Sequence, residues 1–164
     1  MESWDQHIEE FWNSVAGKRP EQLRTELAGL VQGRDPQDPR VLFEIASLHD
    51  YLGEEEQAVG PYRAALDAGL DAPQHDEALL QLASTLRNLG QCTQSIELLR
   101  QIPSGSPIFT DAQAFLALAL HDAGQPTEAL QLALSAIARH ASLYTRAING
   151  YAAELGAPAG AEQR

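Results

Sequence analysis

The segment 79–95, LLQLASTLRNLGQCTQS, decides the fold. Apolar side chains recur in it at the i, i+3, i+4, i+7 spacing that places them on one face of an α-helix. They are Leu79, Leu82, Ala83, Leu86 and Leu89. Gly90 follows, a residue that readily adopts the left-handed conformation in which helices end. Because a second helical pattern begins directly after it, the segment predicts two helices joined by a tight turn.

The same arrangement occurs twice more along the chain. Gly53 lies 37 residues before Gly90, and Gly124 lies 34 residues after it. Each glycine follows an alanine by seven positions and precedes a small residue by five. The alanines are Ala46, Ala83 and Ala117, and the later small residues are Ala58, Ser95 and Ala129. A glycine that recurs at this interval between helical patterns predicts a series of helix–turn–helix units.

Helical patterns extend beyond these units in both directions. An amphipathic aromatic stripe, Trp4 to Val15, ends at Gly17, and Pro20 opens a second helix through Val31. A Pro-rich connector covers residues 33–39. Within the units we expect helices at 41–52, 55–68, 77–89, 93–102, 111–123 and 127–140, and a last helix at 143–155.

Local signals refine these helices. Pro61 falls inside the helix at 55–68, where we expect a kink and no break. Asp76, and either Thr110 or Asp111, stand where N-caps are expected, and Pro126 is expected to open a helix. His49 is expected on a buried stripe, with one ring nitrogen hydrogen-bonded.

Composition agrees with an all-α protein. The 164 residues include 26 Ala and 23 Leu but only 4 Val and 7 Ile, which disfavours a sheet-rich fold. The net charge of −12 at pH 7 argues against binding to nucleic acid or to an anionic membrane surface. The single Cys92 suits a reducing compartment, and no signal peptide is visible, so we expect a cytoplasmic protein.

The repeated segments resemble the tetratricopeptide repeat family. That family places small residues within the first helix, at the turn and at the crossing of the second helix, as Ala46, Gly53 and Ala58 stand here. The family's Trp and Tyr of the first helix are missing. The whole chain also resembles small stand-alone bacterial proteins of this family whose role is undefined.

The resemblance implies a single domain built as a right-handed α–α superhelix. Residues 39–72, 76–109 and 110–143 would be the repeats. Residues 1–33 and 143–155 would be the N- and C-terminal caps, and 156–164 a disordered tail. Because the small residues would lie at close helix crossings, a large side chain at Ala83 or Ala117 should overpack the core.

The resemblance also implies a function: a scaffold that binds a protein or peptide segment in a concave groove, with no catalysis and no cofactor. Groove residues would come mainly from the first helix of each pair. They are Phe43, Ser47, Asp50, Tyr51, Leu80, Ser84, Arg87, Asn88, Leu118, His121, Tyr144 and Arg146, with Arg40, Glu77, Asp111, Ala114 and Asp122 beside them. The basic clamp with which some family members bind acidic tails is missing, so that ligand is not inferred.

Several alternatives stay open at this point. Phe43 and Tyr51 could pack against the N-terminal helices, and Arg87 and Asn88 could simply form a solvated helix end. Trp4, Phe11 and Trp12 could pair two copies of the chain into a homodimer.

A small enzyme or metal site is a further alternative. It would use the His–Asp dipeptides at 49–50, 75–76 and 121–122, although neighbouring residues on a helix point about 100° apart. Cys92 has no CxxC partner, and no phosphate-binding or nucleophile motif is present.

Overall fold

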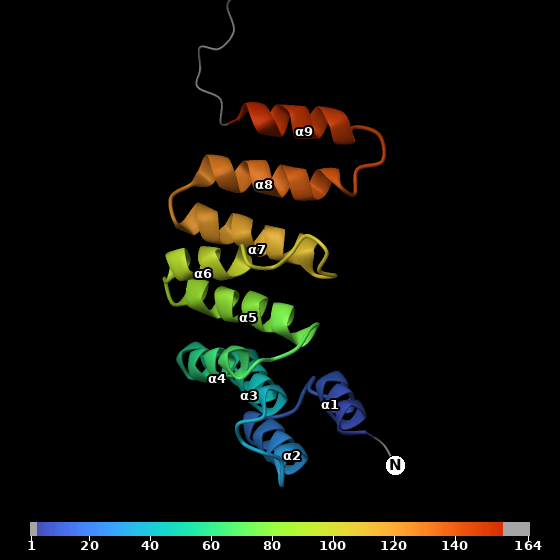
Figure 1. The fold of residues 1–164 in the computed structure, drawn as a ribbon, viewed down its shortest axis with the longest axis vertical. Helices are drawn as coiled ribbons and strands as arrows, with labels where there is room; N and C mark the ends of the chain where they lie inside the picture. The colour runs from blue at the N-terminus through green and yellow to red at the C-terminus, as the bar shows by residue number, and fades with distance from the viewer. Residues whose placement is uncertain (1–2, 156–164) are drawn as a thin grey trace, which may run out of the picture. The chain divides into compact units, whose positions relative to one another are not determined.

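The computed structural model describes residues 3–155, and these form helices without any strand (Figure 1). The helices are α1 (Trp4–Asn13), α2 (Pro20–Val31), α3 (Pro39–Tyr51), α4 (Glu55–Asp67), α5 (Gln74–Asn88), α6 (Cys92–Leu99), α7 (Phe109–Asp122), α8 (Pro126–Ala138) and α9 (Thr145–Glu154). Each predicted helix lies within three residues of these bounds, so the all-α prediction is confirmed. The predicted tail, 156–164, lies outside the described residues.

The chain divides into two compact units, Met1–Gln81 (unit 1) and Leu82–Arg164 (unit 2), with the boundary inside α5. In unit 1, α1 packs on α2, α2 on α3, and α3 most extensively on α4. In unit 2, α6, α7, α8 and α9 pack in chain order, each on the next. The single-domain assignment and its repeat boundaries stay predictions.

The three turn glycines adopt the backbone that the sequence predicts. Gly53, Gly90 and Gly124 have φ angles of +72°, +75° and +77°. In each turn the residue after the glycine donates its amide to a carbonyl five positions earlier, at 2.9, 2.8 and 2.9 Å. These bonds satisfy carbonyls left over at the end of the preceding helix. One turn geometry therefore ends α3, α5 and α7 alike.

The small residues of the repeat lie in the core. Ala46, Ala58, Ala83 and Ser95 have no exposed surface, and Ala117 and Ala129 are 8% and 6% exposed. Large apolar side chains are buried as well, among them Leu82, Leu86, Leu99 and Leu120. The small positions of the repeat are therefore buried, and the close helix crossings expected at them stay a prediction.

One of these small residues carries a polar atom without a partner. The Ser95 hydroxyl oxygen is buried and forms no hydrogen bond with any described residue. An unsatisfied buried hydroxyl costs stability, and alanine is also the better helix former. We therefore expect Ser95→Ala to raise the free energy of unfolding by about 1 kcal/mol in urea titrations.

Ser135→Ala is the matched control for that variant. Ser135 also lies inside a helix, α8, but its residue is only half-buried. Ser135→Ala should raise the free energy of unfolding only through the higher helix propensity of alanine, by about 0.5 kcal/mol. A Ser95→Ala protein that is less stable than the parent would contradict the assignment of this position.

The aromatic stripe of α1 packs inside the chain. Phe11 and Ile8 join Leu23 and Leu27 of α2 and Leu48 of α3 in one buried cluster, with the rings of Trp4 and Trp12 against it. The Trp4 indole N–H donates to the Leu30 carbonyl at 3.0 Å. The stripe thus packs within unit 1, and the pairing of two copies through it stays a hypothesis.

Two local predictions about caps are wrong. α5 begins at Gln74, so Asp76 lies in its first turn, and α7 follows Ile108 as its N-cap, ahead of Thr110. In both places backbone amides donate to preceding carbonyls, as from His75 to Asp71, and Ile108 provides no side-chain cap for α7. α4 runs unbroken through Pro61, as expected, and Pro126 opens α8. The kink at Pro61 stays a prediction.

Candidate functional site

Unit 1 contains a cleft of about 820 Å³. Its first wall is α1, through Asp5, Ile8, Glu9 and Trp12, and its floor is α3. The third side is the segment that leads into and begins α5. α3 supplies Arg40, Phe43, Glu44, Ser47, Asp50 and Tyr51, and the third side supplies Pro73, Gln74, Glu77 and Gln81.

The predicted groove residues of the first repeat lie in this cleft together. Phe43, Ser47, Asp50 and Tyr51 all line it, as do Arg40 and Glu77. The wall from α1 was not predicted. A signal for it exists in the sequence, because Asp5, Glu9 and Trp12 follow one another at i, i+4 and i+7, on one side of a helix.

The floor of the cleft is held by a buried hydrogen-bond network. The Tyr62 hydroxyl of α4 donates to Gln81 Oε1, and the Ser47 hydroxyl reaches the same oxygen at 3.3 Å. The Phe43 ring lies 6.1 Å from the Tyr62 ring, and burial raises the pKa of the Tyr62 hydroxyl. Phe43 and Ser47 are only 5% and 9% exposed, so they form a fixed floor and do not project from it.

Glu44 is a charged side chain buried at the cleft, only 2% exposed. Its Oε2 accepts a hydrogen bond of 2.6 Å from the Trp12 indole, which joins α3 to α1. Burial raises the pKa of the Glu44 carboxyl, and the Trp12 hydrogen bond opposes that rise. Its other oxygen accepts no hydrogen bond from a described residue. The sequence pattern did not single out this residue.

The burial of Glu44 makes its contribution to the stability of the protein depend on pH. Asp5 and Glu77 face Glu44 from α1 and α5 and raise its pKa further, and Arg40 opposes them. Because the folded-state pKa of Glu44 lies above the unfolded one, the stability that Glu44 contributes is lost as pH rises through this range. Glu44→Gln accepts the Trp12 hydrogen bond without a buried charge, so we expect it to be the more stable protein above that range.

Unfolding in urea at several pH values checks this expectation. The advantage of Glu44→Gln should be near zero well below the usual glutamate pKa and should grow as pH rises toward neutrality. Glu97→Gln, at an exposed carboxyl of α6, serves as the control and should show no such trend. A stability difference between Glu44→Gln and the parent that stays constant with pH would contradict the assignment.

Acidic groups outnumber basic ones in the cleft. Five carboxyl side chains line it against the single Arg40, and burial raises the pKa of Glu77 as well. Arg40 Nη2 lies 3.2 Å from Asp5 Oδ1, its guanidinium lies 5.4 Å from the Trp4 ring, and its Nε is buried without a hydrogen-bond partner among the described residues. The cleft therefore presents a negative surface.

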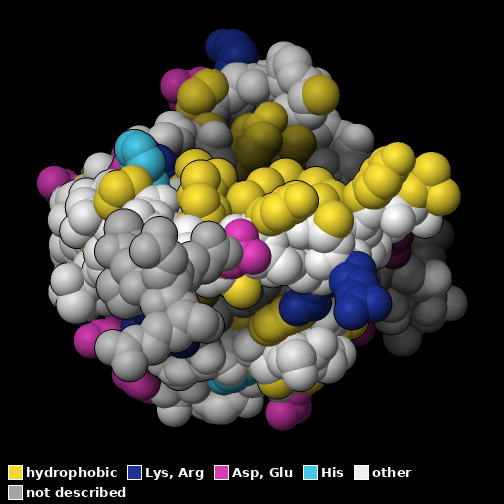
Figure 2. Space-filling view, turned by 90° about the horizontal axis from the view of Figure 1, so that it is seen from above, with side chains coloured by type: hydrophobic (Ala, Val, Ile, Leu, Met, Phe, Trp, Pro, Cys, Tyr) yellow, Lys and Arg dark blue, Asp and Glu magenta, His cyan; other side chains and the backbone are white. Residues whose placement is uncertain are grey.

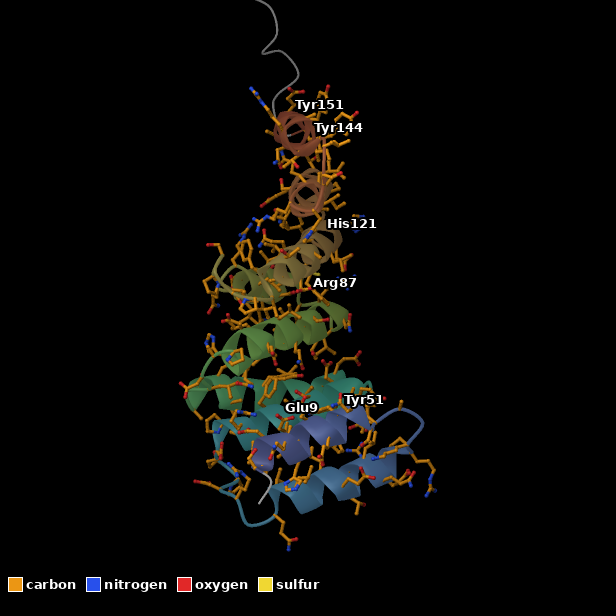
Figure 3. All side chains as sticks on the ribbon, turned by 90° about the vertical axis from the view of Figure 1, so that its right-hand side faces the viewer. Glu9, Tyr51, Arg87, His121, Tyr144 and Tyr151 are labelled. Atoms are coloured by element: carbon orange, nitrogen blue, oxygen red, sulfur yellow. The ribbon has the colours of Figure 1, made fainter. Side chains whose placement is uncertain are left out.

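Aromatic rings form part of the rim. The Trp12 and Tyr51 rings meet edge to face at 6.1 Å and 69°, which brings together the ends of α1 and α3. Tyr51 is 51% exposed, and Figure 3 shows it beside Glu9 on the same side of unit 1. Tyr51 therefore both packs on an N-terminal helix and faces solvent at the rim.

Unit 2 carries a second, apolar cleft of about 600 Å³ between α7 and α8. Three predicted groove positions of α7 line it, namely Ala114, Leu118 and His121. Leu118, Leu130 and Ile137 are 47%, 49% and 60% exposed there. Tyr144 and Arg146 line a separate, shallower pocket on α9. Figure 2, which looks down on the C-terminal end of the chain, shows hydrophobic side chains gathered in a band.

The remaining predicted positions lie outside these clefts. Arg87 Nε is 2.6 Å from Asp122 Oδ2, so this guanidinium is paired within the chain, and Asn88 is exposed at the end of α5. Hydrogen bonds from His121 and Arg87 lower the pKa of Asp122. Leu80 and Ser84 are half-buried and line neither the cleft of unit 1 nor the apolar cleft.

The histidines occupy ordinary structural contacts. His49 is half-buried, and its Nδ1 lies 2.8 Å from Glu54 Oε2 at the turn after α3, so its predicted hydrogen bond is confirmed. His75 and His121 each contact the neighbouring aspartate, at 3.2 and 3.3 Å. Over residues 3–155 no three His, Cys, Asp or Glu side chains come together in a way that could hold a metal ion.

The chain matches one family model and is similar to solved structures. A family model described as "Tetratrico peptide repeat" matches residues 39–155. The solved structure titled "Crystal structure of MamA protein" is similar, with a TM-score of 0.63 and 17% identity over 82% of this chain and 72% of that one. No curated protein matches. Among the described helices, none is both long and apolar enough to cross a membrane.

Proposed function

The chain belongs to the tetratricopeptide repeat family, a family of protein-interaction repeats, and we propose that it binds a peptide segment of a partner protein in the cleft of unit 1. The segment would lie along α3, between α1 and the beginning of α5. Binding would form no covalent bond, and no cofactor would take part.

One observation carries this proposal. Residues that the family resemblance assigns to a groove, from Phe43 to Tyr51, line a single cleft whose floor is fixed by buried hydrogen bonds. A preorganised floor loses little conformational entropy when a ligand binds. An exposed aromatic side chain at the rim, Tyr51, adds the kind of contact that dominates many protein interfaces.

Further support comes from unit 2. Its apolar cleft, with Leu118 and Ile137 exposed, is the kind of concave surface on which an apolar side chain of a partner can be buried.

We also propose that the protein works in the cytoplasm, because a single Cys92 suits a reducing compartment.

Peptide display against the full chain, followed by fluorescence anisotropy of the selected peptides, tests the proposal. Tyr51→Ala should weaken the binding of selected peptides about tenfold, because it removes an aromatic anchor at the rim. Tyr151→Ala is the matched control, since Tyr151 is 70% exposed on α9, in unit 2. Peptides that bind both variants equally well, or that lose affinity only in Tyr151→Ala, would contradict the proposal.

A further inference from the structure

We infer that the partner segment inserts an arginine side chain into the cleft of unit 1, where its guanidinium pairs with Glu44 and lies against the rings of Trp12 and Tyr51. This inference rests on the proposed function and specifies the chemistry of the partner. Three independent features of the cleft support it: its charge, a buried carboxylate, and its aromatic rim.

The charge of the cleft selects a cation. Asp5, Glu9, Glu44, Asp50 and Glu77 line one concavity. The one basic side chain there, Arg40, is already paired with Asp5 at 3.2 Å and stacked near the Trp4 ring. Like charges gathered in a concave surface focus their field and attract a ligand of opposite sign. An acidic segment would be repelled, and a neutral one would leave the carboxylates uncompensated.

Glu44 supplies a specific partner for that cation. Its side chain is almost fully buried, one carboxylate oxygen is held by the Trp12 indole, and the other accepts no hydrogen bond from a described residue. Because Glu44 lines the cleft, a cationic donor that enters it can pair with this carboxylate in surroundings where water screens the charge little. The Trp12 hydrogen bond fixes the orientation of the carboxylate, so the open oxygen is positioned before a ligand arrives.

The aromatic rim favours arginine over lysine. A guanidinium is planar, donates several N–H bonds in a fixed fork, and is less strongly hydrated than an ammonium group. It can therefore donate to Glu44 while one face lies against an aromatic ring. The Trp12 side chain brings the carboxylate and the aromatic rim together, because its indole N–H donates to Glu44 and its ring lies 6.1 Å from the Tyr51 ring. A lysine ammonium would satisfy the charge but not the stacking.

Nuclear magnetic resonance with short synthetic peptides tests the inference directly. The probe is a capped heptapeptide of Gly and Ser with a central arginine, and its matched versions carry citrulline, lysine or glutamate in that place. The chain has two tryptophans, and the Trp12 indole N–H, which donates to Glu44, reports on the site. The Trp4 indole, bound to the Leu30 carbonyl, is the internal reference.

We expect the arginine peptide to shift the Trp12 indole resonance in a saturable way, at constant ionic strength. Citrulline keeps the shape but not the charge, so its apparent affinity should be at least about tenfold lower. Lysine should bind more weakly than arginine, and glutamate should cause no shift. Equal responses to arginine and citrulline would overturn the inference.

A pair of variants separates binding from folding. Glu44→Gln should abolish the preference for arginine over citrulline while the protein stays folded, because glutamine can still accept the Trp12 hydrogen bond. Glu97→Gln, at an exposed carboxyl outside unit 1, should leave the preference unchanged. A preference that survives in Glu44→Gln, or that disappears in Glu97→Gln, would contradict the assigned site.

The peptides selected by display distinguish the proposed peptide-binding function from the arginine inference. If selected peptides lose affinity in Tyr51→Ala but tolerate citrulline for arginine, the arginine inference falls and the peptide-binding function stands. If the arginine probe shifts Trp12 but no selected peptide depends on Tyr51, the cleft binds a cation and the proposed peptide function falls. Selected peptides that contain an essential arginine support both.

Discussion

Phe11→Ala will lower the free energy of unfolding by about 3–5 kcal/mol, because truncation of a buried aromatic side chain loses burial and leaves a cavity. Phe11 is 4% exposed and packs with Ile8, Leu23, Leu27 and Leu48, so it joins α1, α2 and α3 in one cluster. Its ring also meets Trp12 edge to face at 5.0 Å. The variant should therefore loosen α1, the wall of the cleft, before the rest of unit 1.

Urea unfolding followed by circular dichroism measures this loss, and limited proteolysis locates it. Tyr151→Ala removes a side chain that is 70% exposed and should change stability by less than about 0.5 kcal/mol. A Phe11→Ala protein as stable as the parent would mean that α1 does not dock on the repeats, and the cleft would lose its first wall.

Ala83→Leu should cost about 1–3 kcal/mol, because a close-packed core cannot accept three more carbon atoms without strain. Ala83 has no exposed surface and stands at the small position of the repeat in α5. Ala117 occupies the equivalent position in α7 but borders the apolar cleft of unit 2 and is 8% exposed. Ala117→Leu should therefore cost less than Ala83→Leu, because its side chain can extend into open space.

Urea unfolding of Ala83→Leu, Ala117→Leu and the control Ala28→Leu measures the loss of stability in each variant. Ala28 is exposed on α2, so leucine there should leave stability within about 0.5 kcal/mol of the parent. Equal stability of Ala83→Leu and Ala28→Leu would show that position 83 is not a close helix crossing.

The helices and turns were predictable from the sequence because their causes are local. Gly90 needs a left-handed backbone, and a 3.6-residue apolar stripe needs a helix, whatever lies elsewhere in the chain. The N-caps at Asp76 and Thr110 were wrong because a capping side chain is only one way to satisfy the first amides of a helix. Preceding backbone carbonyls also serve, and no residue pattern marks them.

The site was predictable only in part, because its other part depends on contacts between distant segments. The α3 face from Phe43 to Tyr51 follows from the repeat register. Glu44, by contrast, is buried and accepts a hydrogen bond from Trp12, 32 residues earlier, a contact that no local pattern marks. Arg87 was expected in the groove but pairs with Asp122, 35 residues later, one repeat further along the chain.

Site-specific photo-crosslinking tests most directly whether the cleft of unit 1 binds the partner segment. A benzophenone amino acid placed at Tyr51, and separately at Tyr151, is irradiated with a peptide selected by display, and the products are mapped by mass spectrometry. We expect a crosslink from position 51 that an excess of unlabelled peptide suppresses, and none from position 151. A crosslink from position 151 alone would contradict it.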